Sequence, residues 1–145
     1  MNVIRAQIVP CLVVALVLSL FPAMAHAEPL AIIVNKKNPE TNISQSTIAR
    51  MFRGEQLHWP NGGRVKLVNR EIASKNRERF YRFVLNAKPD QTFYRPGTPV
   101  AVRSLIQRSD EAVIRFVAAI EGAIGYVQLS EVTDSVTVVQ IIPDS

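Results

Sequence analysis

Short apolar runs alternate along the chain with longer stretches in which apolar residues recur every three or four positions. Residues 30–34, 65–68, 124–127 and 136–142 are short, apolar and β-prone, and turn-forming Asn, Gly, Asp or Pro residues stand close to them. Runs of this length between turn residues are typical of strands. The pattern therefore predicts a strand at each of these four places.

Helical periodicity begins after residue 43. Ser44 is placed to cap the free amides of a first helix, with apolar Ile48, Met51 and Phe52 at helical spacing, and Gly54 is a suitable stop. A second helix is expected from about residue 74 to residue 85, with its aromatic side chains on one face. Two helices are therefore expected before residue 86.

A third helix is expected to follow Ser109, which can cap it. Asp110 and Glu111 would lie in its first turn, where negative charge is favourable against the helix dipole. Gly122 is expected to stop this helix. Between the second and third helices, residues 87–99 are rich in proline and give no clear pattern, and residues 100–107 are interpreted as a further short helix.

Helices that alternate with short apolar strands predict an α/β fold. The expected architecture is a central sheet, mostly parallel or mixed, flanked by helices. We expect one such domain over residues 28–145, because a chain of that length suits one compact unit and is too short for two.

The first 27 residues carry the signature of export. Arg5 precedes an apolar run over residues 8–20, and Ala25 and Ala27 provide small residues at a cleavage point. The run is shorter than the roughly 20 residues that a membrane span needs, so residues 1–27 are predicted to be a secretory signal peptide cleaved after Ala27. The alternative is an uncleaved anchor. The prediction is a periplasmic or secreted protein with no stable membrane insertion after cleavage.

The amino-acid composition limits the kinds of chemistry expected of the residues that follow the predicted signal peptide. The only cysteine, Cys11, lies in the predicted signal peptide, so no disulfide or thiol chemistry is expected after cleavage. All 12 acidic residues and all but one of the 17 Lys and Arg residues follow it, which favours anionic partners. Export argues against nucleic acid. Only His58 remains as a histidine, with no Asp or Cys at ligand spacing, so we expect no metal, no cofactor and no histidine-based catalysis.

Two motifs carry a family resemblance. The first runs from Phe52 through Gly54 to Trp59, and the second is Ala-Ile-Gly-Tyr-Val at residues 123–127. Together they resemble the second lobe of the phosphate-type periplasmic solute-binding proteins, in which a Phe-x-Gly helix end leads to a Trp and a similar strand lies near the end of the lobe. The resemblance covers roughly residues 30–127. It implies a single lobe of that fold, an anionic solute and no enzymatic activity.

The resemblance also implies a site at the junction of residues 68–74. In open α/β sheets, ligands collect at the carboxyl ends of strands, next to helix N-termini that attract anions. The family carries an Arg there, followed by a Ser-Gly-Thr step that holds an oxyanion. Arg70 and Ser74 match the Arg and the Ser, and Asn69 lies beside them, so Asn69, Arg70 and Ser74 are the expected oxyanion-binding residues.

The match at the junction is partial. Lys75 and Asn76 stand where the family has Gly and Thr, and Glu71 places a carboxylate beside the expected site, which costs anion affinity unless Arg70 neutralises it. The sequence therefore leaves two possible functions. The first is a non-enzymatic solute-binding protein for phosphate or a related oxyanion, linked to ABC-type uptake or sensing. The alternative is an envelope adaptor that has kept the fold but lost ligand binding, with a transporter or another envelope protein as partner.

Overall fold

The computed structural model describes residues 28–144. The predicted signal peptide lies outside the described residues. The described elements, in chain order, are β1 (Leu30–Asn35), α1 (Gln45–Phe52), β2 (Lys66–Arg70), α2 (Lys75–Phe80), a π-helical turn (Tyr81–Leu85), β3 (Leu105–Gln107), α3 (Asp110–Ala119), β4 (Ala123–Gln128), a 3₁₀ turn (Leu129–Glu131) and β5 (Val136–Ile142).

Within residues 28–144 the strands form one sheet in the order β3-β2-β4-β1-β5. β2 is parallel to both β3 and β4, whereas β1 is antiparallel to β4 and to β5. The α/β fold with a mixed sheet and flanking helices is therefore confirmed. Among the parallel strands, β2 ends at Arg70 and β4 ends at Gln128.

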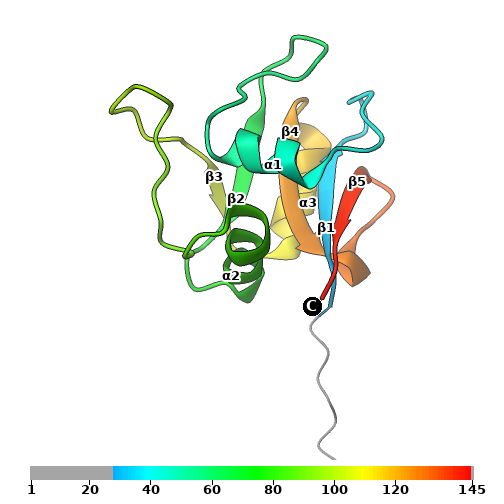
Figure 1. Ribbon diagram of the computed structural model, residues 1–145. Helices are drawn as coiled ribbons and strands as arrows, with labels where there is room; N and C mark the ends of the chain where they lie inside the picture. The colour runs from blue at the N-terminus through cyan, green and yellow to red at the C-terminus, as the bar shows by residue number, and fades with distance from the viewer. Residues whose placement is uncertain (1–27, 145) are drawn as a thin grey trace, which may run out of the picture.

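Helices cover both faces of the sheet, as Figure 1 shows, with α1 and α2 on one side and α3 on the other. The side chains of β1 alternate between two apolar clusters. Ile32 packs in the cluster that includes α1 and α2 residues, and Ile33 packs with α3. Both are fully buried, which explains why β1 reads as a continuous apolar run.

The three predicted helix starts are confirmed by their caps. The hydroxyl oxygens of Ser44, Ser74 and Ser109 each accept a hydrogen bond from the backbone N–H three residues later, which satisfies one of the free amides at each helix start. Gly54, with φ of +77°, follows α1 as expected.

The predicted helix over residues 100–107 is wrong. Ala101 forms an isolated bridge with Tyr94, and Leu105–Gln107 form strand β3. β3 pairs in parallel with Val68–Arg70 of β2. The backbone groups of residues 105–107 thus find partners at the open edge of β2, which a two-turn helix at this position would leave unpaired.

A hydrogen bond connects Trp59, at the end of the first resemblance motif, to Gly122, the residue just before the second. The indole Nε1 of Trp59 donates a hydrogen bond to the carbonyl oxygen of Gly122 at 2.9 Å, and Trp59 is buried. Gly122 has a φ of +83°, and a Cβ there would lie 2.4 Å from the carbonyl oxygen of Arg64. Glycine is required at this position for both its backbone angle and its close contact.

Candidate functional site

The site lies where two helices begin beside the carboxyl ends of parallel strands. β2 ends at Arg70 and β4 ends at Gln128, while α2 starts after Ser74 and α3 starts after Ser109. A shallow depression of about 460 Å³ lies between them. It is lined by Arg70, Ser74, Lys75, Asn76, Arg108, Ser109, Asp110, Glu111, Gln128 and Glu131.

Arg70 lines this depression, as the sequence predicts, but its guanidinium is already paired. It donates to Asp110 Oδ1 at 2.6 Å, to both carboxylate oxygens of Glu71 at 3.0 and 3.2 Å, and to the carbonyl oxygen of Arg108 at 3.3 Å. Only 12% of the Arg70 side chain is exposed. Since a guanidinium has five N–H donors, these contacts leave one N–H without a partner among the described residues.

The pairing of Arg70 shifts the protonation equilibria of the site. Burial alone would lower the pKa of Arg70, but its hydrogen bond to Glu71 and the charges of Glu71 and Asp110 outweigh it, so the pKa is raised above its ordinary value. The Arg70 hydrogen bond in turn holds the pKa of Glu71 below its ordinary value. The positive charge of Arg70 thus compensates the negative charge of Glu71, and both groups remain ionised at neutral pH.

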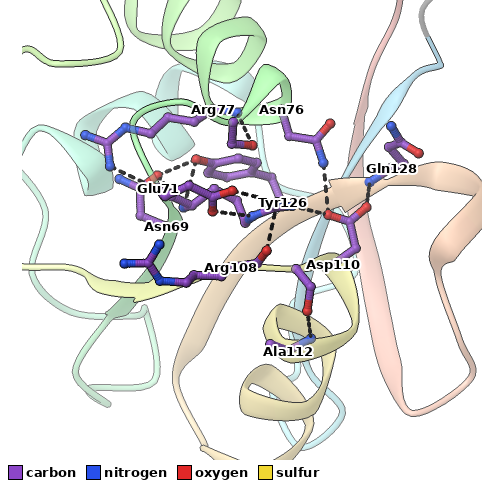
Figure 2. A network of polar contacts seen from close by, with 12 residues as sticks. Asn69, Glu71, Asn76, Arg77, Arg108, Asp110, Ala112, Tyr126 and Gln128 are labelled. Carbon is purple, nitrogen blue, oxygen red and sulfur yellow. Dashed lines mark hydrogen bonds and ion pairs between the residues drawn. The ribbon is translucent and has the colours of Figure 1, made fainter.

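Asp110 occupies the centre of the site, whereas its place in the sequence predicts only a favourable charge in the first turn of a helix. Its Oδ1 accepts from Arg70 and from Asn76 Nδ2 at 2.9 Å, and its Oδ2 accepts from the backbone N–H of Gln128 at 3.0 Å. Figure 2 shows the carboxylate between Asn76 and Gln128. A guanidinium, a side-chain amide and a main-chain N–H are the donor types that recognise an oxyanion, and here an internal carboxylate accepts from all three.

Ser74 and Asn69 contribute differently from what the sequence predicts. Ser74 lines the depression, but its hydroxyl oxygen accepts from the backbone N–H of Arg77 at 3.3 Å and so serves as a helix cap. Asn69 is buried behind the depression. Its Nδ2 donates to the Tyr81 hydroxyl at 2.8 Å, and its Oδ1 accepts from the Tyr126 hydroxyl. The structure therefore brings Arg70 and Ser74 to the depression and leaves Asn69 outside it.

Asn69 and Tyr126 are buried behind the depression and hold the backbone of Arg70 in place. The backbone N–H of Arg70 lies within hydrogen-bond distance of both Asn69 Oδ1, at 2.9 Å, and the Tyr126 hydroxyl, at 3.2 Å. Burial raises the pKa of the Tyr126 phenol well above its ordinary value. The Tyr126 ring stacks on Phe80 with centroids 4.2 Å apart. This buried pair fixes the backbone at the end of β2, where Arg70 projects.

The amides at the two helix starts are the donors that remain for a ligand. The hydroxyls of Ser74 and Ser109 satisfy one N–H in each first turn, and an α-helix start leaves further amides without a helical partner. Arg108 and Lys75 add exposed cations at the rim. The depression can therefore accept a small anion across the two helix starts, but Asp110, Glu111 and Glu131 oppose it.

Two further observations concern residues 28–144. These residues include no group of three or more His, Cys, Asp or Glu side chains placed to hold a metal ion. None of the helices formed by them is long and apolar enough to cross a membrane.

This α/β arrangement, with helix starts facing the carboxyl ends of parallel strands, is that of one lobe of a solute-binding protein. The family model described as PBP superfamily domain matches residues 23–141. The chain therefore belongs to the PBP superfamily domain family. The resemblance to phosphate-type solute-binding proteins, read from the two sequence motifs, is confirmed.

Solved structures of phosphate-related transport proteins share this fold. A Clostridium perfringens protein with bound phosphate, described as a phosphate ABC transporter substrate-binding protein, is 26% identical with a TM-score of 0.64, over 78% of this chain and 44% of that one. An ABC-type phosphate transport receptor from Vibrio cholerae is 24% identical, with a TM-score of 0.64, over 78% of this chain and 46% of that one. For PstS from Borrelia burgdorferi the identity is 20% and the TM-score 0.64, over 78% and 47%.

The chain spans less than half the length of each of these three structures. The likeness to the second and third, which are under 25% identical, concerns the fold. The first is named as a substrate-binding protein and the second as a transport receptor, in agreement with the expectation of a non-enzymatic protein.

Proposed function

We propose that this chain is an exported, non-enzymatic solute-binding protein that recognises phosphate or a related small oxyanion at the depression beside Arg70. One observation carries the proposal. Arg70, Asn76 and the backbone N–H of Gln128 converge on one point, and an anionic group, the Asp110 carboxylate, already sits there with three kinds of donor around it. The local geometry is thus suited to an oxyanion.

The affinity is expected to be low. The depression is shallow and open to water, so each charge-assisted contact is screened and contributes less than it would in an enclosed cleft. The Asp110 carboxylate also competes for the same donors. Replacing it with the neutral amide in Asp110→Asn removes one negative charge from the site, and phosphate is expected to bind on the order of tenfold more tightly, which corresponds to about 1.4 kcal/mol.

Calorimetric titration with inorganic phosphate tests the proposal. The exported protein is expected to bind phosphate in the millimolar range, Asp110→Asn to bind it more tightly, and Glu40→Gln, which changes a distant, half-buried acid, to match the unmodified protein. Butyrate, a monovalent carboxylate, is expected to bind more weakly than phosphate. If neither the protein nor Asp110→Asn releases heat or gains thermal stability with phosphate, the proposal is rejected.

A second candidate is an adaptor of the cell envelope that does not bind a solute. The neutralisation of Arg70 by Asp110 and Glu71 favours it, because the charge that would hold the anion is already compensated. An adaptor would retain its partner, a transporter component or another envelope protein, when Arg70 and Asp110 are replaced together by Gln and Asn. A solute-dependent partner would be lost from that variant.

Export is part of both candidates. We propose that residues 1–27 are removed and that the protein acts in the periplasm or outside the cell. Intact-mass measurement of the protein from the envelope fraction is expected to give a chain that starts at Glu28. Recovery of the uncleaved chain in the membrane fraction would indicate an anchor instead.

A further inference from the structure

A second cavity lies at the other end of β2. Lys66 begins this strand and Arg70 ends it. β3 pairs only with Val68–Arg70, so the first two residues of β2 pair with β4 on one side and have no strand partner among the described residues on the other. A cavity of about 470 Å³ occupies the space beside this unpaired part of the strand.

The interior of this cavity is apolar. Met51 and Leu67, both buried in the core, form part of its wall, together with the half-buried side chains of Val102 and Phe116. Leu105 at its margin is 44% exposed. The volume lies in the range of about 300–1,000 Å³ that is typical of small-molecule sites, and such sites are lined mainly by apolar side chains.

Cations surround the apolar interior. Arg64, Lys66, Arg95 and Arg103 line the cavity and come from two separate segments, the start of β2 and the loop before β3. None of them forms an ion pair with an acid of residues 28–144. No acidic residue lines the cavity. This contrasts with the depression beside Arg70, which is lined by three acids as well as three cations.

An apolar interior with four unpaired cations around it complements a molecule that has one anionic head and one apolar chain. We infer that this cavity binds an amphipathic monoanion such as a fatty-acid carboxylate. The chain lies against Met51, Val102 and Phe116, and the head meets Lys66 and Arg103. An added peptide strand fits less well, because β3 already occupies the same edge of β2 from Leu105 onward.

Rigidity of the cavity wall supports a site rather than a fluctuating gap. A Cβ built on Gly54 would lie 2.5 Å from Val102 Cγ2, so the end of α1 packs tightly against the loop before β3. The backbone N–H of Val102 donates to the carbonyl oxygen of Phe93 at 2.8 Å, and that of Val65 donates to Leu57 at 2.9 Å. A preformed wall reduces the ordering cost of binding.

Three ligands separate the contributions of head and chain. Dodecanoate has both, 1-dodecanol has only the chain, and butyrate has the charge with a chain too short to fill the cavity. Titration calorimetry on the exported protein, with dodecanoate kept monomeric, is expected to show saturable binding of one dodecanoate. Both 1-dodecanol and butyrate are expected to bind at least tenfold more weakly. Equal binding of 1-dodecanol would overturn the inference, as would the absence of dodecanoate binding.

Variants locate the site. Lys66→Gln combined with Arg103→Gln is expected to weaken dodecanoate binding at least tenfold, whereas Lys88→Gln, an exposed cation away from the cavity, leaves it unchanged. Equal losses in both variants would mean non-specific attraction and would contradict the inference. Circular dichroism melting confirms that each variant is folded, and Leu105→Asn, which keeps all the cations, gives an independent loss through the apolar wall.

The outcome is independent of the proposed phosphate site. Saturating inorganic phosphate is expected to leave dodecanoate affinity unchanged. Competition between the two ligands would place dodecanoate at the depression beside Arg70 and overturn the inference.

Discussion

Arg70 Nη1 and Asp110 Oδ1 lie 2.6 Å apart, and this contact joins the end of β2 to the start of α3. The two residues are 40 positions apart in the chain, and their side chains are only 12% and 13% exposed. An ion pair that is shielded from water to this extent is less screened than a surface pair. The contact therefore shapes the depression and fixes the start of α3 against the end of β2.

Asp110→Asn is expected to destabilise the fold by about 1–3 kcal/mol, because it removes a charged acceptor that serves Arg70, Asn76 and the Gln128 backbone. Chemical denaturation measures the change. Glu111→Gln is the matched control, since Glu111 is the next residue on the same helix turn but is exposed, and its effect is expected to be below about 0.5 kcal/mol. Equal effects of the two substitutions would contradict a structural role of Asp110.

Tyr126→Phe removes the buried hydroxyl that donates to Asn69 and lies beside the Arg70 backbone N–H. The expected loss is about 1–3 kcal/mol in the free energy of unfolding, because Asn69 is left with an unsatisfied acceptor position. Tyr94→Phe provides the control. Tyr94 is 56% exposed, so its hydroxyl is solvated in the folded protein and its removal is expected to change stability by less than about 0.5 kcal/mol.

Gly122→Ala and Gly97→Ala compare two glycines with similar backbone angles, φ of +83° and +71°. Both substitutions place a Cβ on left-handed backbone, which costs roughly 1 kcal/mol. At Gly97 nothing lies within 4 Å of the new atom, whereas at Gly122 the carbonyl oxygen of Arg64 lies at 2.4 Å. Gly122→Ala is therefore expected to lower the melting temperature clearly more than Gly97→Ala, and equal shifts would contradict the close contact.

Glu71 should make stability depend on acid pH. Its pKa is below the ordinary value of 4.5 in the folded protein, chiefly because of the Arg70 hydrogen bond. A carboxylate whose pKa is lowered by folding contributes its full stabilisation above the pKa that it has in the unfolded chain. That contribution is lost as pH falls through the pKa that it has in the folded protein. Glu71→Gln is therefore expected to reduce the difference in melting temperature between pH 7 and acid pH. An unchanged pH profile would show that the pair contributes nothing.

Local patterns predicted the helices and most strands, because caps, turn residues and apolar spacing act over a few residues. Ser44, Ser74 and Ser109 each sit at the predicted helix start. β3 was missed because three residues carry too little periodicity, and its pairing partner lies 37 positions away in β2. Pairing of this kind depends on the assembled sheet and has no local signature.

The sequence predicts a site at the junction of residues 68–74, where the depression lies, but it does not predict the negative charge that Asp110 adds there. Arg70 and Ser74 were identified from the strand-to-helix junction. Asp110 was assigned only to its own helix, although an acid at the start of a helix that follows a parallel strand faces the same edge as the end of β2. That signal was hidden, because β3, the strand before this helix, has no recognisable pattern of its own. No comparable signal reveals that Asn69 turns inward toward Tyr81, since residue type alone does not fix the face of a strand end.

The central claim is that an oxyanion binds across the two helix starts beside Arg70, and amide chemical shifts measured during a phosphate titration test it most directly. In the ¹⁵N-labelled exported protein, the largest shifts are expected at the backbone amides of Lys75, Asn76, Asp110 and Glu111, with a common saturation curve that moves to lower phosphate concentration in Asp110→Asn. Shifts confined to the cationic cavity at the start of β2, or no saturable shift at the helix starts in either protein, would contradict the account.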